Sequence, residues 1–530
     1  MNKNIAIILI LFAFNMQART FYVAKNGNDS NDGSEASPWL SIKKAANTLV
    51  AGDTVLIKSG IYRERVIVGN SGTKDNYIVF KNYKKDIVTV DGRDIFWWDW
   101  DGLFNVSEKS YIKIIGLAIK NSNYGGIWIE DSNNIIINNN YTYNTISCGI
   151  GVWGSSNIIV SENEVELACN DGEQECISIA NSNNCIITKN HIHDNGAGTN
   201  GGEGIDVKAG SHDIIVSKNI VHNLNNRIGI YVDAWDSDTY NIDIIQNRVY
   251  YCDDTGLAVA SERGGLLENI NFFNNISYYN KWGGIELGGW TDVEYSGPTP
   301  IKNVKFINNT CYKNGSFNGG WGFGISVNNS YAENVIIRNN ICSENTAQIG
   351  IEKILSAGVI DHNLIYGDNN VATTTNGSNP IIGDPLFVDV ENFNFHISNN
   401  SPAIDNGSSI DVPNIDFSNT NRPYGARYDI GAYEFTPQLD VDINEDYTKM
   451  IDTYPNPFSD ILHIKINGEK FQKYFFKIFN SRGELVRKET SKKLKNGIVI
   501  IDKLNLSTGI YILSITIDSK TLVSKKIICK

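Results

Sequence analysis

The chain has 530 residues, more than one domain usually needs, and with 41% hydrophobic and 20% charged residues it is globular rather than disordered. Its formal net charge of −13 argues against a nucleic acid as partner. Glycine is frequent and proline and methionine are rare, at 47, 11 and 3 residues, which favours many tight turns over long helices.

The first 19 residues have the pattern of a secretory signal peptide. Lys3 precedes an apolar run from Ile5 to Phe14, and small Ala18 stands near the expected cleavage point. No later stretch of the sequence is long and apolar enough to span a bilayer. We therefore expect an exported protein without a membrane span, whose mature chain begins near residue 20.

The middle of the chain is built from a sequence repeat. Segments such as NIIINNN, NIIVSEN and DIIVSKN end in asparagines that recur every 23 to 34 residues: Asn140, Asn163, Asn190, Asn219, Asn247, Asn275, Asn309 and Asn340. Between them stands a second repeat of the kind GIWI, GIDV, GIYV and GIEL, so each unit carries at least two short alternating strands. This period, with β-branched strands and no helical pattern, predicts a right-handed parallel β-helix. We expect the asparagines to form an internal ladder at a bend.

Both ends of this solenoid have their own sequence signals. SIKKAANTLV, residues 41–50, predicts an amphipathic helix, which we expect to cap the first coil. The opening segment FYVAKNGNDSNDG resembles the start of many secreted β-helix proteins, and segments 384–389, 401–407 and 422–435 resemble their closing part. We therefore assign residues 20–435 to the β-helix.

The eight cysteines include no CxxC pair, and export would permit a disulfide between Cys169 and either Cys176 or Cys185. We favour the alternative that most of the cysteines are small buried residues. The seven histidines show no ligand spacing with the cysteines, so the sequence does not predict a zinc site.

Aligned rungs of a β-helix turn positions of the repeat into surface columns, whose members are about 4.8 Å apart. In the GIxV strands the residue between the two apolar positions points outward. The first outward column is Trp128, Gly151, Ser178, Asp206, Tyr231, Ala258, Glu286 and Ser326. The second, two residues later, is Glu130, Trp153, Ala180, Lys208, Asp233, Ala260, Gly288 and Asn328. The stretch GGEGIDVKAG, residues 201–210, places charges in the middle of both columns.

Seven polar side chains gather on two or three neighbouring rungs of this face: Glu175, Glu203, Asp206, Lys208, Arg227, Tyr231 and Asp233. Small residues flank them along the columns, which predicts a groove rather than a ridge. Cross-strand ion pairing would explain a single pair, but seven groups on one face favour a functional site. Trp153 and Trp235 suit stacking on sugar faces, and Asp233, Glu286 and Arg263 suit contacts with further sugar units.

Such a groove on an exported β-helix suits an acidic polysaccharide as substrate. In β-elimination, a base removes the proton alpha to a uronate carboxylate, whose charge must be neutralised by a cation. Lys208 would be the base, Arg227 or Ca²⁺ the neutralising cation, and Tyr231 the proton donor. The candidate ligands of the Ca²⁺ are the carboxylates of Glu203, Asp206 and Glu175.

Two other functions also fit the sequence. In hydrolysis, a pair of carboxylates would act as acid and base, either Asp206 with Asp233 or Asp233 with Glu286. Lys208 would then only bind the substrate or tune an aspartate. A non-catalytic surface protein that binds polysaccharide would use the aromatic residues and need no base. We take the lyase as the first hypothesis, and Lys208 is the residue that distinguishes it from a hydrolase.

The stretch GEGIDVKAGSHDIIVSKNIVHNLNNRIGIY resembles the active-site stretch of polysaccharide lyase family 6, the chondroitinase B and alginate lyase group. There a glutamate that ligates Ca²⁺ stands five residues before the base lysine, as Glu203 stands before Lys208. An arginine follows about one rung later, as Arg227 does here. A second glutamate expected two residues before Glu203 is Gly201 in this chain, so Asp206 or Glu175 would have to replace it.

The C-terminal part of the chain is expected to form a separate domain after a polar, acidic linker at 436–449. Residues 450–530 carry YPNPFSDILHIKI, FKIFNSRGELV and LSTGIYILSI, which closely resemble the C-terminal sorting domain of the type IX secretion system. The resemblance implies a small β-sandwich and makes the secretion machinery an expected partner. A carbohydrate-binding sandwich is the alternative. We expect a monomer that is secreted or held at the cell surface.

Overall fold

The computed structural model describes residues 18–436, except 99, 171–172, 197–200, 316–321, 353–357 and 369–372. It also describes residues 451–530, except 467–473, 481–484, 492–497, 503–505 and 518–520. All but the last two residues of the predicted signal peptide lie outside the described residues, as does nearly all of the predicted linker. The chain divides into two compact units, Met1–Phe435 and Thr436–Lys530.

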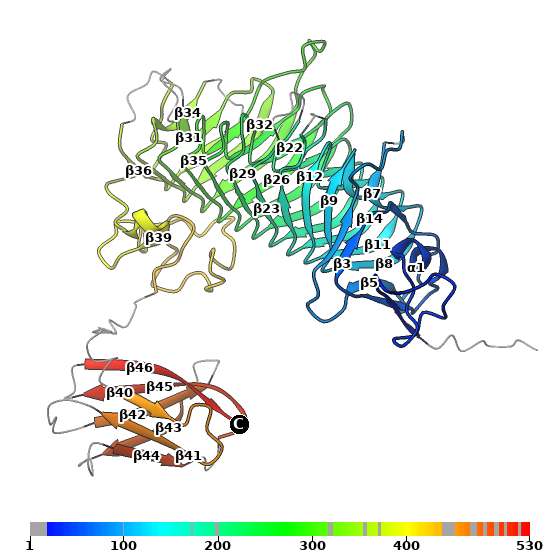
Figure 1. Ribbon diagram of the computed structural model, residues 1–530. Helices are drawn as coiled ribbons and strands as arrows, with labels where there is room; N and C mark the ends of the chain where they lie inside the picture. Colours follow the sequence, from blue (N-terminus) through cyan, green and yellow to red (C-terminus); the bar gives the residue numbers. More distant parts are fainter. Residues whose placement is uncertain are drawn as a thin grey trace, which may run out of the picture. The chain divides into compact units, whose positions relative to one another are not determined.

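The first unit consists of three long parallel sheets that run along its length (Figure 1). Sheet 1 contains β1 (Thr20–Val23), β2 (Thr54–Ile57), β5 (Ile78–Asn82), β8 (Ser110–Ile115), β11 (Asn133–Asn138), β14 (Ser156–Ser161), β17 (Asn183–Thr188), β20 (His212–Ser217), β23 (Thr239–Ile245), β26 (Leu267–Phe273), β29 (Ile301–Ile307), β32 (Ala332–Arg338) and β35 (Val359–Asp361). Sheet 2 contains β4 (Val66–Ile67), β7 (Gly102–Ser107), β10 (Gly125–Glu130), β13 (Ile150–Trp153), β16 (Ile177–Ala180), β19 (Ile205–Lys208), β22 (Ile230–Asp233), β25 (Leu257–Ala260), β28 (Ile285–Leu287), β31 (Phe323–Val327) and β34 (Ala347–Ile351). Sheet 3 contains β3 (Gly60–Tyr62), β6 (Val88–Asp91), β9 (Ala118–Ser122), β12 (Tyr141–Thr145), β15 (Glu164–Glu166), β18 (His191–His193), β21 (Ile220–His222), β24 (Arg248–Tyr250), β27 (Ile276–Tyr278), β30 (Thr310–Tyr312), β33 (Ile341–Ser343), β36 (Leu364–Tyr366) and β37 (Ile381–Ile382).

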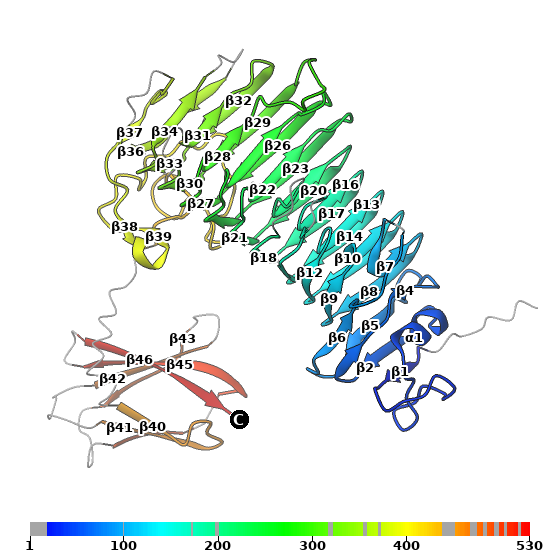
Figure 2. The ribbon, with the colours of Figure 1, turned by 45° about the horizontal axis from the view of Figure 1, so that its top comes forward.

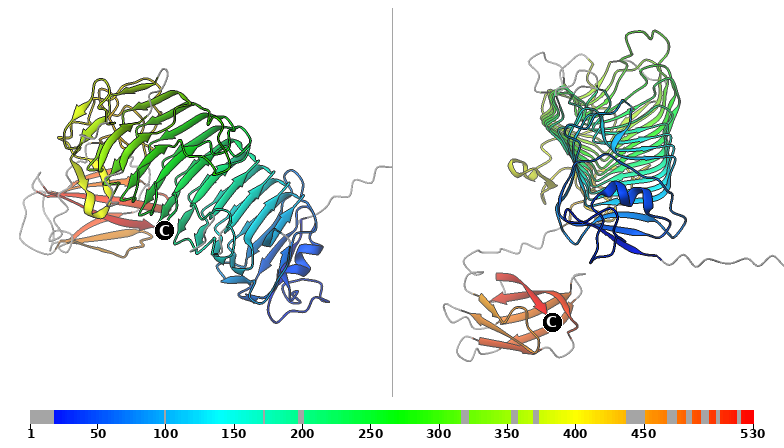
Figure 3. Two further views of the ribbon diagram at one scale, coloured as in Figure 1. Left: turned by 90° about the horizontal axis from the view of Figure 1, so that it is seen from above. Right: turned by 45° about the vertical axis from the view of Figure 1, so that its right-hand side comes forward.

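Each turn of the coil contributes one strand to each sheet. The chain runs from β10 through β11 to β12 and then returns to sheet 2 as β13, which pairs in parallel with β10. Figure 2 and Figure 3 show the successive strands stacked in this way along the whole unit. The predicted all-β fold, a right-handed parallel β-helix, is therefore confirmed.

The core of the β-helix is a set of apolar columns inside the coil. In sheet 2, Ile177 pairs with Ile205 and Ile205 with Ile230, and all three side chains are fully buried. Burying each such side chain away from water contributes roughly 1.5–3 kcal/mol to the stability of the fold. The alternation of apolar and polar residues in every strand thus fixes which residues face the core and which face solvent.

The repeated asparagines form the predicted ladder at the bend between sheets 1 and 3. From Asn140 to Asn340, each side-chain Oδ1 accepts the backbone N–H of the previous asparagine at 2.9–3.0 Å and its Nδ2 at 3.0–3.1 Å. The residue before each one is in the left-handed region, with φ between 54° and 58°. The ladder therefore satisfies the backbone of a tight bend that every coil repeats. Asn363 extends it by one coil.

The N-terminal coil is covered by helix α1 (Ile42–Thr48), as predicted for this segment. Ser41 caps the helix, since its side chain accepts the backbone N–H of Lys44. Ile42, Ala45 and Ala46 are buried and join the main core. The helix lies at the blue end of the solenoid in Figure 2, where it shields the open edge of the core.

The segment after β37 packs along the side of sheet 3. It holds an antiparallel pair, β38 (Phe387–Asp389) and β39 (Asn394–Ile397), joined by the short helix η1 (Val390–Asn392). Phe395 and Tyr433 pack on Tyr278 and Tyr312 of sheet 3. Arg422 and Glu434 form a fully buried ion pair at 2.6 Å within the segment.

The second unit has two antiparallel sheets. One contains β40 (Ile451–Tyr454), β41 (Ile461–Ile466) and β44 (Ile498–Asp502), and the other contains β43 (Leu485–Ser491), β42 (Tyr474–Asn480), β45 (Gly509–Ile517) and β46 (Thr521–Cys529). Their inner faces share one core, in which Leu462 and Ile464 of the first sheet meet Phe476 and Leu513 of the second. This arrangement is the small sandwich that the sequence predicts.

All eight cysteines are buried with free thiols, so the cysteines are small core residues rather than a disulfide framework. Within the described part of the chain, no helix has the length and apolar character needed to cross a membrane.

Candidate functional site

The candidate site lies on the outer face of sheet 2, where the predicted columns are confirmed by the strand register. Asp206 of β19 pairs with Ser178 on one side and with Tyr231 on the other. Lys208 pairs with Ala180 in the same way. The register of the first column continues without a slip from Trp128 to Ser326. The β-helix thus places side chains from distant parts of the sequence on adjacent rungs.

Lys208 is the centre of the charged cluster. Its Nζ lies 2.5 Å from Glu175 Oε1 and 3.8 Å from Asp206 Oδ2. It also donates to Gln174 Oε1 at 3.4 Å and lies 5.9 Å from the centre of the Trp153 ring. Glu175 reaches the lysine from the turn before β16, one rung earlier, as the sequence predicts.

The ionisation of Lys208 is set by two opposing effects. Burial lowers the pKa of its ammonium group, but the charges of Glu175 and Asp206 outweigh burial and hold the pKa above its usual value. Lys208 is therefore protonated while these carboxylates are charged. A lysine acts as a base only when its amine is neutral. Lys208 can reach that state only if the negative charge around it is first neutralised.

The carboxyl groups of this cluster repel one another. Burial and the neighbouring Glu175 raise the pKa of Asp206 well above its usual value and raise the pKa of Glu203 to about 7. Asp206 is only 3% exposed, and its Oδ1 has no hydrogen-bond partner among the described residues. Glu175 itself is held by Lys208 on Oε1 and by the Ser178 hydroxyl on Oε2. The cluster thus keeps more acidic groups together than its single lysine can neutralise.

Arg227 stands at the edge of the cluster. Its Nε lies 3.9 Å from Glu203 Oε1 and donates to the backbone carbonyl of Gly201. The arginine therefore joins the turn before β22 to the turn before β19, and its cation lies beside Glu203 as predicted.

Tyr231 and Asp233 are more enclosed than the sequence suggests. The Tyr231 hydroxyl donates to Glu262 Oε1 at 2.6 Å and accepts from Trp290 Nε1 at 3.2 Å, and the ring is 5% exposed. Burial raises the pKa of Tyr231 well above its usual value. Burial, followed by Glu262, also raises the pKa of Asp233 well above its usual value.

The remaining predicted substrate contacts lie along the same face. Trp153 stacks on Trp128, with 5.5 Å between ring centres, and stands beside Lys208. Trp235 is 36% exposed, and the Arg263 guanidinium covers its ring at 5.1 Å. Arg263 is also paired with Asp236 at 3.3 Å, so it holds this tryptophan in place.

A hollow on this face surrounds Glu286, three turns beyond Lys208. It is lined by Trp282, Gly283, Glu286, Gly322, Phe323, Ser326, Asn328 and Glu352. Burial and the nearby Asp254 raise the pKa of Glu286 to about 7. With about 4.8 Å per rung, this hollow is about 14 Å from Lys208, the length of two to three sugar units.

The predicted Ca²⁺ ligands fit the ion in their chemistry, because Ca²⁺ takes carboxylate oxygens. The unpartnered Asp206 Oδ1 and the raised pKa of Glu203 are consistent with a place for a further cation. As the side chains lie here, however, the Lys208 ammonium is the cation beside Glu175. Among the described residues, ligand atoms of Glu203, Asp206 and Glu175 do not all lie within 4.8 Å of one another, so Ca²⁺ binding by these three stays a prediction.

Four further residues hold members of the predicted cluster in place. Ser178 and Gln174 hold Glu175 and Lys208, while Glu262 and Trp290 hold Tyr231. Ser178 precedes Asp206 in the first outward column, so the repeat pattern alone could have found it. Trp290 is 59 residues from Tyr231 and carries no such signal.

Three parts of the chain match known family models. Residues 21–171 match "Pel9A-like, right handed beta helix region", residues 174–299 match "Right handed beta helix region", and residues 452–530 match "Secretion system C-terminal sorting domain". The β-helix unit is thus similar to pectate-lyase-like right-handed β-helix families, and the second unit is similar to a type IX sorting domain, which indicates secretion to the cell surface or outside. The narrower resemblance to polysaccharide lyase family 6 stays a prediction.

Single proteins give the same picture over most of the chain. An uncharacterized protein YwoF of Bacillus subtilis (strain 168) is 25% identical over 440 residues, which cover 72% of this chain and 91% of that protein. Pectate lyase L of Dickeya dadantii (strain 3937) is 22% identical over 455 residues, 78% of this chain and 90% of the lyase. The solved complex of XylC with xylose has a TM-score of 0.54 at 13% identity and covers 79% of this chain and 98% of that one, which is a likeness of fold alone.

Proposed function

We propose that this protein is an exported enzyme that cleaves an acidic, uronate-containing polysaccharide by β-elimination on the outer face of sheet 2. The observation that carries the proposal is Lys208, a partly buried lysine among acidic groups in the middle of the outer face of sheet 2. The similarity to a pectate lyase over most of both chains supports it. The tryptophans along the same face, Trp153 and Trp235, supply stacking surfaces for sugar rings.

In this mechanism the charge around Lys208 controls its proton. When Glu203 and Asp206 are neutralised, by protons or by a bound cation, two of the charges that raise the pKa of Lys208 are removed and the pKa falls. Its extra proton then passes to Glu175 Oε1, which lies 2.5 Å away. The neutral amine can take the proton alpha to the uronate carboxylate.

Elimination also needs a cation for the carboxylate of the substrate and an acid for the leaving oxygen. Arg227 at the edge of the cluster, with Ca²⁺ held by Glu203 and Asp206, would neutralise that carboxylate. As the proton leaves, its electron pair forms the double bond and the bond to the 4-linked sugar breaks. Asp233 is next to Lys208 in the predicted column and holds its proton more strongly than an ordinary aspartate, so we assign it the role of proton donor. Tyr231, held beneath Trp290 by its hydroxyl, supports this rung instead.

Hydrolysis is the second candidate, and the raised pKa values of the carboxyl groups favour it. Asp206 and Asp233 both hold a proton more strongly than usual, which suits a general acid. As diagonal neighbours on adjacent rungs, their Cα atoms are about 8 Å apart by strand geometry. Inverting glycosidases have about 6.5–9.5 Å between the two carboxyl groups, a distance that this separation of Cα atoms permits.

The first test is incubation of the full chain with a panel of uronate polymers, with and without a chelator. Elimination leaves an unsaturated uronate, which we expect to see as ultraviolet absorbance on at least one polymer. New reducing ends without that absorbance would replace elimination by hydrolysis. If chelator removes the signal and Ca²⁺ restores it, the carboxylate cluster holds the ion.

A further inference from the structure

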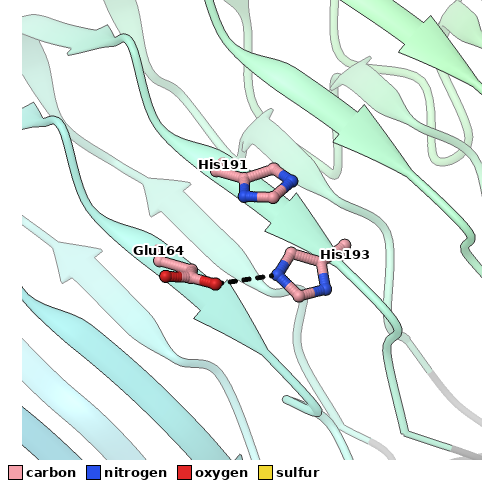
Figure 4. A group of neighbouring side chains, drawn as sticks. All are labelled: Glu164, His191 and His193. Atoms are coloured by element: carbon pink, nitrogen blue, oxygen red, sulfur yellow. Dashed lines mark hydrogen bonds and ion pairs between the residues drawn. The ribbon is translucent and has the colours of Figure 1, made fainter.

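A second cluster of titratable side chains lies on the outer face of sheet 3, away from the charged face of sheet 2. Figure 4 shows Glu164 of β15 beside His191 and His193 of β18. One ligand atom from each of the three residues lies within 4.8 Å of the other two. Among the described residues, this is the only group of three or more such side chains that meets this spacing.

The β-helix creates this group from residues that are distant in the sequence. His191 and His193 are two residues apart on one strand, so both side chains point to the same side of the sheet. The register places Glu164 directly opposite His191 on the preceding rung. On the following rung, His222 of β21 stands opposite His193.

The two histidines are oriented by partners on their other nitrogens. His193 Nδ1 lies 2.7 Å from Asp194 Oδ2, while Nε2 points to Glu164 Oε1 at 3.2 Å. His191 Nε2 lies 2.8 Å from His222 Nε2, which leaves Nδ1 as its other nitrogen. Metal-binding histidines typically have this arrangement, with one nitrogen held by a carboxylate or another polar group and the other directed at the metal.

We propose that Glu164, His191 and His193 bind one divalent transition-metal ion, with Zn²⁺ the best suited. Two imidazole nitrogens and a carboxylate oxygen are ligands that zinc prefers, and hard ions such as Ca²⁺ take oxygen ligands instead. Zinc held at about 2.1 Å from each ligand brings the ligand atoms about 3.4 Å apart, so the present spacing closes with small side-chain rotations. Glu164 is 48% exposed and His193 10%, which gives the ion a path from solvent.

The ion would join two turns of the solenoid and fix the start of the segment that leads to the charged face. Asn195, two residues after His193, donates to the Gly202 carbonyl and accepts from the backbone N–H of Asn225. Glu203 follows directly. The sequence gives no zinc spacing because the ligands come from consecutive rungs, 27 residues apart in the chain between Glu164 and His191.

Zinc binding by the full chain tests the proposal. After treatment with chelator and desalting, the protein is titrated with Zn²⁺ by calorimetry, and the metal retained is counted by elemental analysis. A parallel titration with Co²⁺ is followed by its visible absorption, which reports nitrogen and oxygen ligands. We expect one tightly bound Zn²⁺ and a higher unfolding temperature in its presence.

Three variants locate the site. His193→Gln and Glu164→Gln are each expected to weaken Zn²⁺ binding at least about tenfold, and Asp194→Asn about tenfold through the orientation of His193. His212→Gln is the matched control, because His212 also pairs with an adjacent aspartate, at 2.8 Å, and stacks on a tyrosine, but on sheet 1. Glu164→Gln changes a half-exposed side chain, so it remains informative if a histidine variant fails to fold.

Two outcomes would overturn the proposal. If the chain retains no Zn²⁺, the contacts of His193 with Glu164 and Asp194 only hold the imidazole in place and serve no metal. If Zn²⁺ binds equally well to His193→Gln, Glu164→Gln and the control, the ion is held elsewhere in the molecule. Neither outcome affects the uronate assay, because that assay depends on the charged cluster around Lys208 on sheet 2.

Discussion

The asparagine ladder and the charged cluster on sheet 2 both stack polar groups on successive rungs. They differ in whether the groups on neighbouring rungs satisfy or repel one another. In the ladder each amide donates to one neighbour and accepts from the next, so every rung satisfies the rung beside it. In the cluster, Glu175 raises the pKa of both Asp206 and Glu203. Two cations accompany these three acidic groups, Lys208 beside Glu175 and Arg227 beside Glu203. The same stacking of rungs therefore stabilises the fold in the asparagine ladder, whereas in the charged cluster it brings acidic groups together that repel one another.

This difference separates structural polar residues from functional ones. A buried network that satisfies its own hydrogen bonds rigidifies a core, whereas buried like charges lower stability and persist where a site uses them. The five predictions below test the comparison, beginning with the largest expected effect.

Lys208→Ala should abolish nearly all activity while the fold remains intact. A general base contributes on the order of 10²–10⁴ in rate, so we expect a loss of about 10³-fold in kcat on the uronate polymer that responds. Absorbance assays measure the rate, and circular dichroism checks the fold. Lys189→Ala is the control, since Lys189 forms an exposed pair with Glu162 at 3.6 Å. Turnover near normal in Lys208→Ala would remove the elimination mechanism.

Asn219→Ala should destabilise the β-helix strongly. It leaves the buried backbone N–H and amide of Asn190 without their acceptor, and we expect unfolding to need about 3 kcal/mol less free energy. Chemical denaturation followed by fluorescence measures the loss.

Asp206→Asn provides the contrast, because it removes a repelled charge from an equally buried position. We expect the free energy of unfolding to stay the same or to rise, while activity falls. Asn271→Ala, which removes one surface hydrogen bond to Asp243, serves as a mild control. Equal destabilisation by Asn219→Ala and Asp206→Asn would contradict the distinction between the two columns.

Glu203→Gln should flatten the pH dependence of stability. In the unfolded chain Glu203 loses its proton near 4.5, while in the fold it keeps the proton until about pH 7. Because the pKa of this carboxyl group is higher in the folded chain, its contribution to the free energy of unfolding is fully present below the pKa of the unfolded chain. The contribution is lost as the pH rises towards the pKa of the folded chain. We expect the wild type to lose on the order of 2 kcal/mol more than the variant between these two pH values. Parallel curves for both proteins would show that Glu203 ionises normally.

Tyr231→Phe should have the smallest effect on catalysis. The hydroxyl is bound to Glu262 and Trp290 beneath the surface, so its loss should lower kcat/KM less than about tenfold. Asp233→Asn, by comparison, should lower it about 100-fold as the proton donor. The reverse order of the two effects would return the role of acid to Tyr231.

The sequence alone was sufficient for the solenoid and for the columns. Its repeat predicted the ladder from Asn140 to Asn340, and its strand pattern predicted that Asp206 and Tyr231 share a face. Local signals also predicted helix α1 and the C-terminal sandwich. These features follow from periodicity, because a β-helix repeats one geometry and a shift of one residue would bury the polar face.

Only the tertiary structure decided what the individual groups do. The charges of Glu175 and Asp206 outweigh burial and keep Lys208 protonated, and the position of Trp290 determines that Tyr231 is covered. Glu164, His191 and His193 share no sequence motif, since their spacing depends on the length of the turn between two rungs. Sequence fixes which residues point outward, but ionisation and coordination depend on distances in three dimensions, which the packing of the coils sets.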